Sequence, residues 1–170
     1  DGVSVLGDWL PATVMTTSVV VLLWVLRRWA DAAYLVLITA GSTPLNWLIK
    51  ELVDRPRPDH ILTEATKGLS SNSFPSGHTV FASAFFGLLV VYIFDLDLGP
   101  RWARRIAQVL LIGLILSMGI SRIYLGVHWP SDILGGYTFS AIYLTVVMWH
   151  RGYIRANRLT FVGRHGEDRG

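Results

Sequence analysis

The sequence predicts an all-α fold, a multi-pass bundle of transmembrane helices, and three observations support this. Hydrophobic residues make up 52% of the 170 residues and charged residues only 16%, with a mean hydropathy of +0.45. Long apolar stretches follow one another with short polar connections, and tryptophans gather near their ends. A soluble domain of this length is normally less apolar, so a membrane protein is the first interpretation.

Five apolar stretches come close to the roughly 20 residues that a helix needs to cross a bilayer. In chain order they are residues 10–26, 32–49, 78–94, 106–120 and 133–149. The remaining connections leave no room for a soluble domain with its own core. We therefore expect residues 1–170 to form a single membrane domain.

A soluble five-helix bundle is the main alternative, and the pattern within the stretches argues against it. Helices of a soluble bundle carry a polar stripe at the helical period. Here "VVVLLWVL", "AYLVLITA" and "VLLIGLILSMGI" are apolar on all sides. The tryptophans near the span ends are Trp9, Trp29, Trp47, Trp102, Trp129 and Trp149. They lie where an interfacial aromatic belt would lie.

Composition also excludes several classes of chemistry. The chain has no cysteine, which excludes disulfides, thiolate catalysis and cysteine-ligated metal sites. The pI is about 9.5, but the basic residues are scattered over predicted helix ends, so we expect no nucleic-acid partner. The chain starts at Asp1 without a signal-peptide pattern, so we expect a trimmed chain that lacks a preceding segment.

The distribution of lysine and arginine predicts the topology. Ten basic residues follow the first span, separate the third from the fourth, or fill the tail: Arg27, Arg28, Arg101, Arg104, Arg105, Arg151, Arg155, Arg158, Arg164 and Arg169. The positive-inside rule places these on the cytoplasmic side. The other side then holds the N-terminus, the connections 50–77 and 121–132, and five basic residues: Lys50, Arg55, Arg57, Lys67 and Arg122. Basic residues on the disfavoured side suggest a function there.

Three polar segments bring ionisable groups to this second side. The first is "KELVDRPRP", in which six residues separate Lys50 from Arg57. The second is "PSGH" at residues 75–78, and the third is "SRIYLGVHWPSD" at residues 121–132. Connections on one side of a bundle can converge, so we expect the three segments to form one site at the membrane surface.

The residue types at this site are those of a phosphate pocket. Lys50, Arg57 and Arg122 provide three positive charges, and the two guanidinium groups suit bidentate contact with phosphate oxygens. Ser76 and Gly77, at the predicted start of a helix, can offer a hydroxyl and exposed backbone amides to an anion. Glycine also lets an oxyanion approach the backbone closely.

The same segments supply the groups for phosphoryl transfer. Histidine can form a covalent phosphoryl intermediate when a carboxylate holds its other ring nitrogen. Asp132 lies four residues after His128, in the first turn of a helix that we expect to begin at Pro130. We therefore predict that His128 is the nucleophile and Asp132 its orienting partner. His78 would protonate the leaving oxygen and then activate water.

These residues resemble the PAP2 (type 2 phosphatidic acid phosphatase) superfamily, which includes membrane lipid phosphatases, glucose-6-phosphatase and the vanadium haloperoxidases. The patterns K-x6-R-P, P-S-G-H and S-R-x5-H-x3-D are matched at every signature position between residues 50 and 132. The resemblance is to the bacterial membrane lipid phosphatase branch. It implies that Lys50, Arg57, Ser76, Gly77 and Arg122 bind phosphate. It also implies that His78 is the general acid, His128 the nucleophile and Asp132 its partner.

The resemblance further implies a six-helix bundle whose site faces outward and needs no metal. Five spans are visible here, so we expect that the first helix is missing or trimmed. The residues also favour a mechanism without a metal or other cofactor. The acidic residues on this side show no paired metal-ligand spacing, and three fixed cations can neutralise a phosphoryl group instead.

The function we predict is a metal-independent membrane lipid phosphatase that acts at the extracytoplasmic face through a phosphohistidine. Its partners are the bilayer and a lipid phosphate or diphosphate, with undecaprenyl diphosphate, phosphatidic acid and phosphatidylglycerol phosphate as candidates. A vanadate-dependent haloperoxidase-like enzyme and a non-catalytic lipid-binding or transport protein are the alternatives. The connection 59–74 is either a lid or a passive loop.

Glycines in the fourth and fifth apolar stretches predict close packing between them. They are Gly113, Gly119, Gly135 and Gly136, and small residues let transmembrane helices approach one another. Such packing would hold Arg122 and Asp132 in register at adjoining helix ends.

Overall fold

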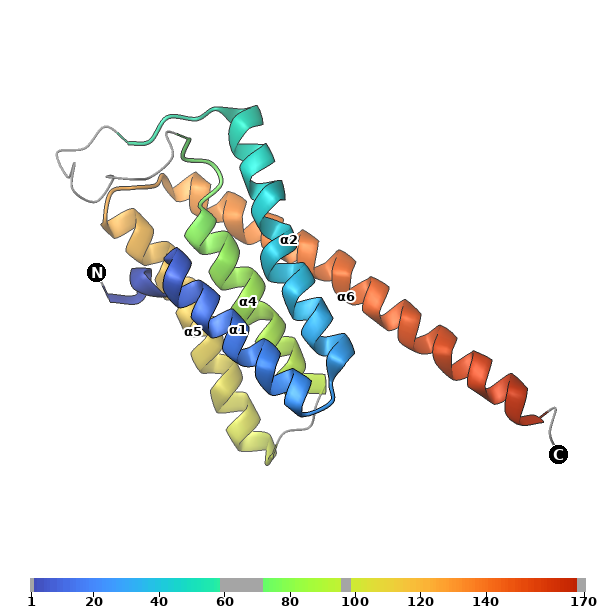
Figure 1. The fold of residues 1–170 in the computed structure, drawn as a ribbon. Coiled ribbons are helices and arrows are strands. Elements are labelled where there is room, and N and C mark those ends of the chain that lie inside the picture. Colours follow the sequence, from blue (N-terminus) through green and yellow to red (C-terminus); the bar gives the residue numbers. More distant parts are fainter. Residues whose placement is uncertain (1, 59–71, 96–98, 168–170) are drawn as a thin grey trace.

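The computed structural model describes residues 2–58, 72–95 and 99–167, with side chains up to residue 156. A short 3-10 helix, η1 (Gly2–Gly7), is followed by α1 (Trp9–Val25), α2 (Trp29–Val53), α4 (Gly77–Asp95), α5 (Arg101–Tyr124) and α6 (Pro130–Glu167) (Figure 1). Most of the connection considered as a lid, residues 59–71, lies outside the described residues.

Each predicted apolar stretch coincides with one helix. The α1 and α4 helices match the stretches 10–26 and 78–94 to within one residue at each end. The other three helices are longer than predicted, because polar residues continue them beyond the apolar stretch. The η1 helix was not predicted, since six residues are too few to show a helical period.

The lengths of the helices suit a bilayer. Among the described residues, four helices are long and apolar enough to cross a membrane: α2, α4, α5 and the Pro130–Ala156 part of α6. The α1 helix has 17 residues and is about 26 Å long at 1.5 Å per residue. That is slightly short of the roughly 30 Å hydrocarbon core.

The α4 helix lies at the centre of the bundle. It packs against α2, α5, α6 and η1, and nine of its 19 residues are buried. Neighbours on several sides explain why its sequence is apolar all round. The last part of α6 projects away from the other helices (Figure 1).

The outer surface is apolar and part of the interior is charged. Val14, Leu110 and Val146 are each more than half exposed, whereas Asp31 and Arg151 are buried. A water-soluble protein rarely exposes so many large apolar side chains on its helices. The distribution fits a bundle whose outer face contacts lipid.

A Cβ would be crowded at three of the four predicted glycines, but only Gly119 makes the predicted contact between α5 and α6. A Cβ at Gly119 would overlap Tyr137 and Ile133 of α6. Likewise, a Cβ at Gly135 would overlap the Phe74 ring, and one at Gly136 would crowd Thr79. The predicted packing of α5 on α6 is therefore wrong for Gly135 and Gly136, which face Phe74 and α4 instead, and for Gly113, which has open space beside it.

An arginine–aspartate cluster of Asp31, Asp95, Arg151 and Arg155 lies at the end of the bundle where α2 begins and α4 ends. Arg151 Nη2 is 2.8 Å from Asp31 Oδ1, and Arg151 Nη1 is 2.5 Å from Asp95 Oδ2. Arg155 lies 3.5 Å from Asp31 and 3.7 Å from Asp95. The cluster ties α6 to α2 and α4, so these two arginines are packing residues as well as tail charges.

Candidate active site

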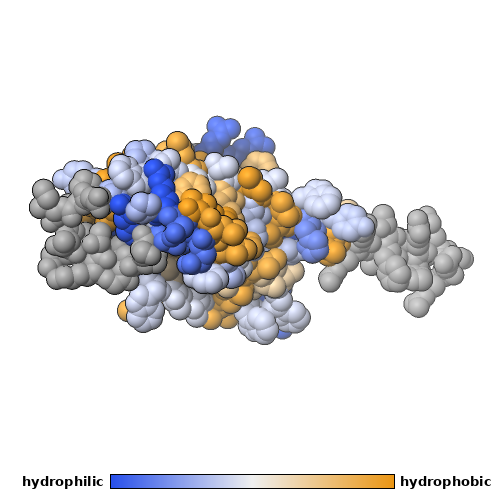
Figure 2. Space-filling model, turned by 90° about the horizontal axis from the view of Figure 1, so that it is seen from above, coloured by the Kyte–Doolittle hydropathy of each residue, from blue (hydrophilic) through white to orange (hydrophobic). Residues whose placement is uncertain are grey.

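The three motif segments meet at the end of the bundle opposite the arginine–aspartate cluster. Lys50 lies in the last turn of α2 and Arg122 in the last turn of α5. Gly77 begins α4, and Asp132 lies in the first turn of α6. Figure 2 looks down on this end and shows hydrophilic residues gathered there with apolar residues around them. The helix ends therefore bring segments far apart in the sequence to one place.

Lys50 joins the end of α2 to the segment that precedes α4. Its buried Nζ donates to the carbonyl oxygens of Asn72 at 2.8 Å and Ser73 at 3.4 Å. Asn72 Nδ2 donates back to the Lys50 carbonyl at 3.1 Å. Neutral carbonyl oxygens hold the ammonium group in place without cancelling its charge.

The "PSGH" segment is held against the start of α6. The Ser76 amide donates to the Asp132 carbonyl at 3.1 Å, and the Ser76 hydroxyl accepts a hydrogen bond from Thr79 at 3.1 Å. The expectation that Ser76 offers an exposed backbone amide is therefore wrong, since that amide is already bonded. The Ser76 hydroxyl hydrogen and the Gly77 amide, in the first turn of α4, are the donors of this segment that suit an anion.

His128 lies between a carboxylate and a guanidinium. Its Nδ1 is 3.4 Å from Asp132 Oδ2, and its Nε2 is 3.3 Å from Arg57 Nη1. An ionised carboxylate can only accept hydrogen bonds, so Asp132 favours the tautomer with the proton on Nδ1 and the lone pair on Nε2. The fully buried Asp132 also accepts from the Trp129 amide at 2.9 Å and from Arg55 Nη1 at 3.0 Å.

The surroundings of His128 keep its ring neutral. Burial lowers the pKa of His128 to about 2, and the positive charges of Arg57 and Arg122 act in the same direction. Burial also lowers the pKa of Arg57, and Asp132 partly offsets this. A guanidinium still remains charged near neutral pH. The site therefore combines a neutral imidazole with fixed cations.

Arg122 is buried beside the N-terminal segment. Its Nη1 donates to Ser4 Oγ at 3.4 Å, and Ser4 Oγ lies 2.8 Å from Ser121 Oγ. Among the described residues, Nε of Arg122 has no hydrogen-bond partner. Its described hydrogen-bond partner is thus a neutral hydroxyl, and the Asp8 carboxylate compensates the charge of the guanidinium only in part.

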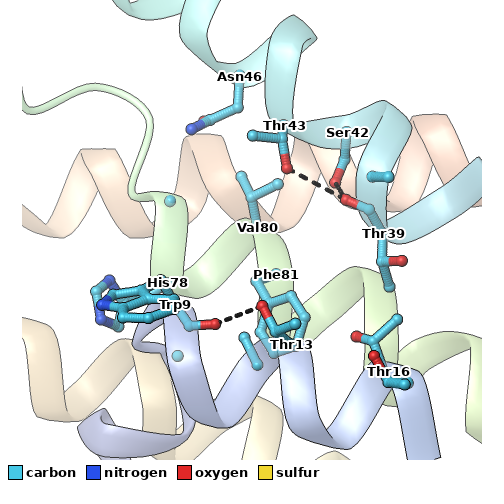
Figure 3. Close-up of a pocket in the computed structure, with 15 residues that line it drawn as sticks. Trp9, Thr13, Thr16, Thr39, Ser42, Thr43, Asn46, His78, Val80 and Phe81 are labelled. Carbon is cyan, nitrogen blue, oxygen red and sulfur yellow. Dashed lines mark hydrogen bonds between the residues drawn. The ribbon is translucent and has the colours of Figure 1, made fainter. Parts of the chain in front are cut away.

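His78 stands at the start of α4 beside an elongated pocket. The pocket has a volume of about 590 Å³, lies between α1, α2 and α4, and reaches from His78 and Asn46 to Thr16 (Figure 3). Threonine and serine side chains line much of it, and several donate their hydroxyl hydrogens to carbonyls of their own helix. The pocket offers space for an elongated group next to the His78 ring.

A family model of the PAP2 superfamily matches residues 31–156, which include all three motifs. The chain belongs to the PAP2 superfamily. Its structure is also similar to the crystal structure of a transmembrane PAP2 type phosphatidylglycerolphosphate phosphatase from Bacillus subtilis. The TM-score is 0.73 at 26% identity, over 90% of this chain and 75% of the other. This likeness confirms the predicted transmembrane bundle, and the chain is a multi-pass membrane protein.

Curated relatives of this PAP2 chain carry several substrate names. It is 30% identical over 125 residues to phosphatidylglycerophosphatase B of Bacillus subtilis, covering 71% of this chain and 58% of the relative. It is 30% identical over 128 residues to a lipid A 1-phosphatase of Rhizobium etli, covering 70% and 50%. A putative undecaprenyl-diphosphatase of Escherichia coli is 31% identical over 122 residues, covering 70% and 57%. The chain therefore spans about half to three fifths of these relatives.

Two charged side chains that are not signature positions of the PAP2 motifs contact motif residues. Arg55 Nη1 donates to Asp132 and to Ser131 Oγ at 2.6 Å, with its guanidinium 5.5 Å from the centre of the Trp129 ring. Asp8 Oδ1 lies 3.0 Å from His78 Nε2. Sequence reasoning placed both on the correct side without assigning them a role. The position of Arg55 within the K-x6-R-P motif, two residues before Arg57, was a usable signal, whereas no local signal pointed to Asp8.

The PAP2 site has no obvious cage for a metal. Within the part of the chain that the structure describes, no three histidine, aspartate or glutamate side chains gather in a metal-binding group. The metal-independent mechanism stays a prediction, which turnover in a chelator would test.

Proposed function

We propose that this chain is a lipid phosphatase that hydrolyses a lipid phosphate or diphosphate through a phosphohistidine on His128. One observation carries the proposal: the Asp132 carboxylate lies on Nδ1 of the neutral His128 ring, while Nε2 faces Arg57. A neutral imidazole has a lone pair for attack, and the adjacent guanidinium can bind the oxygens of the phosphorus atom under attack.

In the first step Nε2 of His128 forms a bond to phosphorus and the bond between phosphorus and the lipid oxygen breaks. His78 gives a proton to that oxygen, which leaves as a lipid alcohol or a lipid monophosphate. The Asp132 carboxylate stabilises the positive charge that develops on the His128 ring. In the second step water attacks phosphorus, His78 accepts its proton, and the bond to Nε2 breaks.

Fixed positive charges supply the stabilisation of the transferring group. Lys50, Arg57 and Arg122 would surround the phosphoryl oxygens, and the Ser76 hydroxyl and Gly77 amide would add neutral donors. Cations held rigidly by protein dipoles need no rearrangement as charge develops, which makes them effective in phosphoryl transfer. No step requires a cofactor, so we expect full turnover in excess EDTA.

The membrane setting supports a lipid as the leaving group. The pocket beside His78 continues along α1 and α2 into the bundle, so a chain attached to the leaving oxygen could follow it toward the bilayer. Phosphatidylglycerol phosphate, lipid A 1-phosphate and undecaprenyl diphosphate are the candidates that the relatives suggest, and phosphatidic acid is a fourth.

Phosphate release by the purified protein in detergent tests this function across that panel of lipids. We expect turnover of at least one lipid, total loss in His128→Ala, and no loss in the matched control His150→Ala. His150 lies at the other end of the bundle, 3.1 Å from the Tyr34 hydroxyl. Mass spectrometry after an alkaline quench should find phosphate on His128. Equal turnover by His128→Ala and the parent would overturn the proposal.

We also propose that the site faces the extracytoplasmic side, because the larger group of basic residues lies at the other end. The chain has no cysteine, so a single engineered cysteine reports on its own position. In intact cells a membrane-impermeant maleimide should label Tyr124→Cys at the site end and leave Trp102→Cys unlabelled. The reverse labelling would place the site in the cytoplasm.

A further inference from the structure

The N-terminal segment reaches the proposed site although it lies outside the motifs and outside the matched residues 31–156. The η1 helix packs against α4 and α5, the helices that carry His78 and Arg122. Ser4 contacts Arg122, and Asp8 contacts His78. The segment thus touches residues of two of the three motifs.

The Asp8 carboxylate does not serve the start of the helix it precedes. Asp8 is the N-cap residue of α1, a position where aspartate normally accepts a hydrogen bond from an amide of the first turn. Its side chain makes no such bond, and Oδ1 lies 3.0 Å from His78 Nε2 instead. Helix capping therefore leaves the direction of this carboxylate unexplained.

We propose that Asp8 is a positioning residue that fixes the orientation and tautomer of His78, so that Nδ1 is the nitrogen that exchanges protons with the substrate. This inference rests on the proposed function. An ionised carboxylate only accepts hydrogen bonds, so Nε2 carries a hydrogen. Nδ1 then holds the lone pair of the neutral ring and the second proton of the charged ring.

Gly7 supports the ring from a second direction. An ideal Cβ on Gly7 would overlap Cδ2 of His78 and lie 3.1 Å from the His78 Cβ. The backbone at Gly7 therefore lies directly against the ring, while Asp8 holds Nε2. A side chain at position 7 would move the ring away from its place.

The two histidines then work with opposite ring nitrogens. Asp132 holds Nδ1 of His128 and leaves Nε2 for phosphorus, whereas Asp8 holds Nε2 of His78 and leaves Nδ1 for the proton. When the bond between phosphorus and the lipid oxygen breaks, that oxygen takes the Nδ1 proton and His78 becomes neutral. Water later returns a proton to Nδ1 as its oxygen bonds to phosphorus and the bond to His128 breaks.

The exposure of Asp8 limits the size of its effect. The Asp8 side chain is 53% exposed, whereas Asp132 is fully buried. Water competes for an exposed carboxylate, so Asp8 orients its histidine less strongly than Asp132 does. We expect its removal to slow the proton-dependent step without abolishing turnover.

The test compares two substrates that differ in their need for a general acid. Dioctanoyl phosphatidic acid releases an alcohol that needs a proton, whereas p-nitrophenyl phosphate releases a stabilised phenolate that does not. kcat/KM depends only on the steps up to and including phosphoryl transfer to His128. Hydrolysis of the phosphohistidine, which is the same for both substrates, therefore does not affect it. We expect Asp8→Asn to lower kcat/KM for the lipid about 10- to 100-fold, part of what a positioned proton donor contributes. The value for p-nitrophenyl phosphate should stay nearly unchanged.

Gly7→Ala should give the same selective loss through displacement of the ring. Glu51→Gln removes the same charge from an exposed residue at the same end and should change neither value. Equal losses on both substrates in Asp8→Asn would show a merely structural role, and unchanged values on both would show none. Either result overturns the inference.

Failure of the proposed phosphatase function would give a different result from failure of the proposed role of Asp8. A parent protein inactive on p-nitrophenyl phosphate and on every lipid of the panel would refute the phosphatase and leave Asp8 to be tested on its own. The nitrogen NMR chemical shifts of His78 in selectively labelled protein then show whether Asp8 sets the tautomer of this ring. We expect the Nε2-protonated tautomer in the parent and a mixture in Asp8→Asn, and identical spectra would overturn the inference.

Discussion

At one end of the bundle Arg151 lies between Asp31 and Asp95, whereas at the other end Lys50 and Arg122 lie against neutral oxygens. Both ends bury positive charge. In the arginine–aspartate cluster two aspartates pair directly with the buried arginine, whereas at the site end Lys50, Arg57 and Arg122 outnumber the carboxylates Asp8 and Asp132 that act on them. The first arrangement ties helices together. The second leaves a positive potential for an anion that the substrate brings.

The difference follows from the cost of burying charge. A buried cation is tolerated when an opposite charge and hydrogen bonds compensate its lost hydration. Carbonyl and hydroxyl oxygens compensate only part of it, and Lys50, Arg57 and Arg122 also repel one another. The site end should therefore reduce stability in exchange for phosphate affinity, and the cluster end should add stability without affecting the chemistry.

Breaking the cluster should give the largest effect. In Arg151→Gln the buried Asp31 loses its main partner, so the free energy of unfolding should fall by about 3–5 kcal/mol. Chemical unfolding in mixed micelles measures this, with exposed Arg105→Gln as a control at the same end. The folded fraction should keep its kcat/KM. Lost activity at unchanged stability would contradict the assignment of this end to packing.

Arg122→Gln should have the opposite signature at the site end. Removal of one preorganised donor typically lowers kcat about 10²- to 10³-fold. The free energy of unfolding should stay the same or rise, because one of three mutually repelling cations is gone. Activity assays and unfolding on the same preparation check both parts. A clear loss of stability with full activity in the folded fraction would show that Arg122 stabilises the fold and does not serve the chemistry.

Inorganic phosphate should stabilise the protein through the site end. A ligand that binds only the folded state at 100 times its Kd adds about 2.7 kcal/mol to the free energy of unfolding. A rise in Tm with phosphate concentration measures this. Lys50→Gln should weaken the response and Arg105→Gln should not. An equal response in both variants would place the anion elsewhere.

The smallest effect concerns acid stability. The pKa of His128 is about 2 in the folded protein and about 6.5 in an unfolded chain. Below about pH 6.5 the unfolded chain therefore binds a proton that the folded ring does not. Stability should be lost by about 1.4 kcal/mol for each pH unit below that value and should be flat above it.

The His128→Asn variant isolates this contribution from the other histidines. Between about pH 7.5 and about pH 5.5 the parent should lose about 1.4 kcal/mol more than the variant. Unfolding curves at the two pH values measure the difference. Parallel losses in the two proteins would mean that His128 is not held neutral.

Much of the fold could be predicted, because the bilayer acts on every residue of a span. A helix that crosses lipid must be apolar over its length, and this pattern located α1 and α4 to within one residue. The segment Gly2–Gly7 could not be predicted, because its contacts with α4 and α5 are tertiary. Gly113 was assigned to a helix contact that the fold does not make.

The site was predictable to the extent that its residues are unusual for their surroundings. Ionisable side chains beside apolar spans are costly and so point to a function, which identified Lys50, Arg122 and His128. The bond of the Ser76 amide to the Asp132 carbonyl was hidden, because it joins residues 56 positions apart. The ion pairs of Arg151 were also hidden from the sequence, because its acidic partners lie on two other helices.

The sequence by itself determined which long helices exist, which end each motif occupies and which chemical groups are available. Those properties follow from hydropathy and from the chemistry of single side chains, both of which are local. Only the tertiary structure decided which charges are neutralised and which ring nitrogen each carboxylate holds. Such pairings depend on distances of a few ångströms between Asp8 and His78 or between Asp31 and Arg151, and helix packing alone sets those distances.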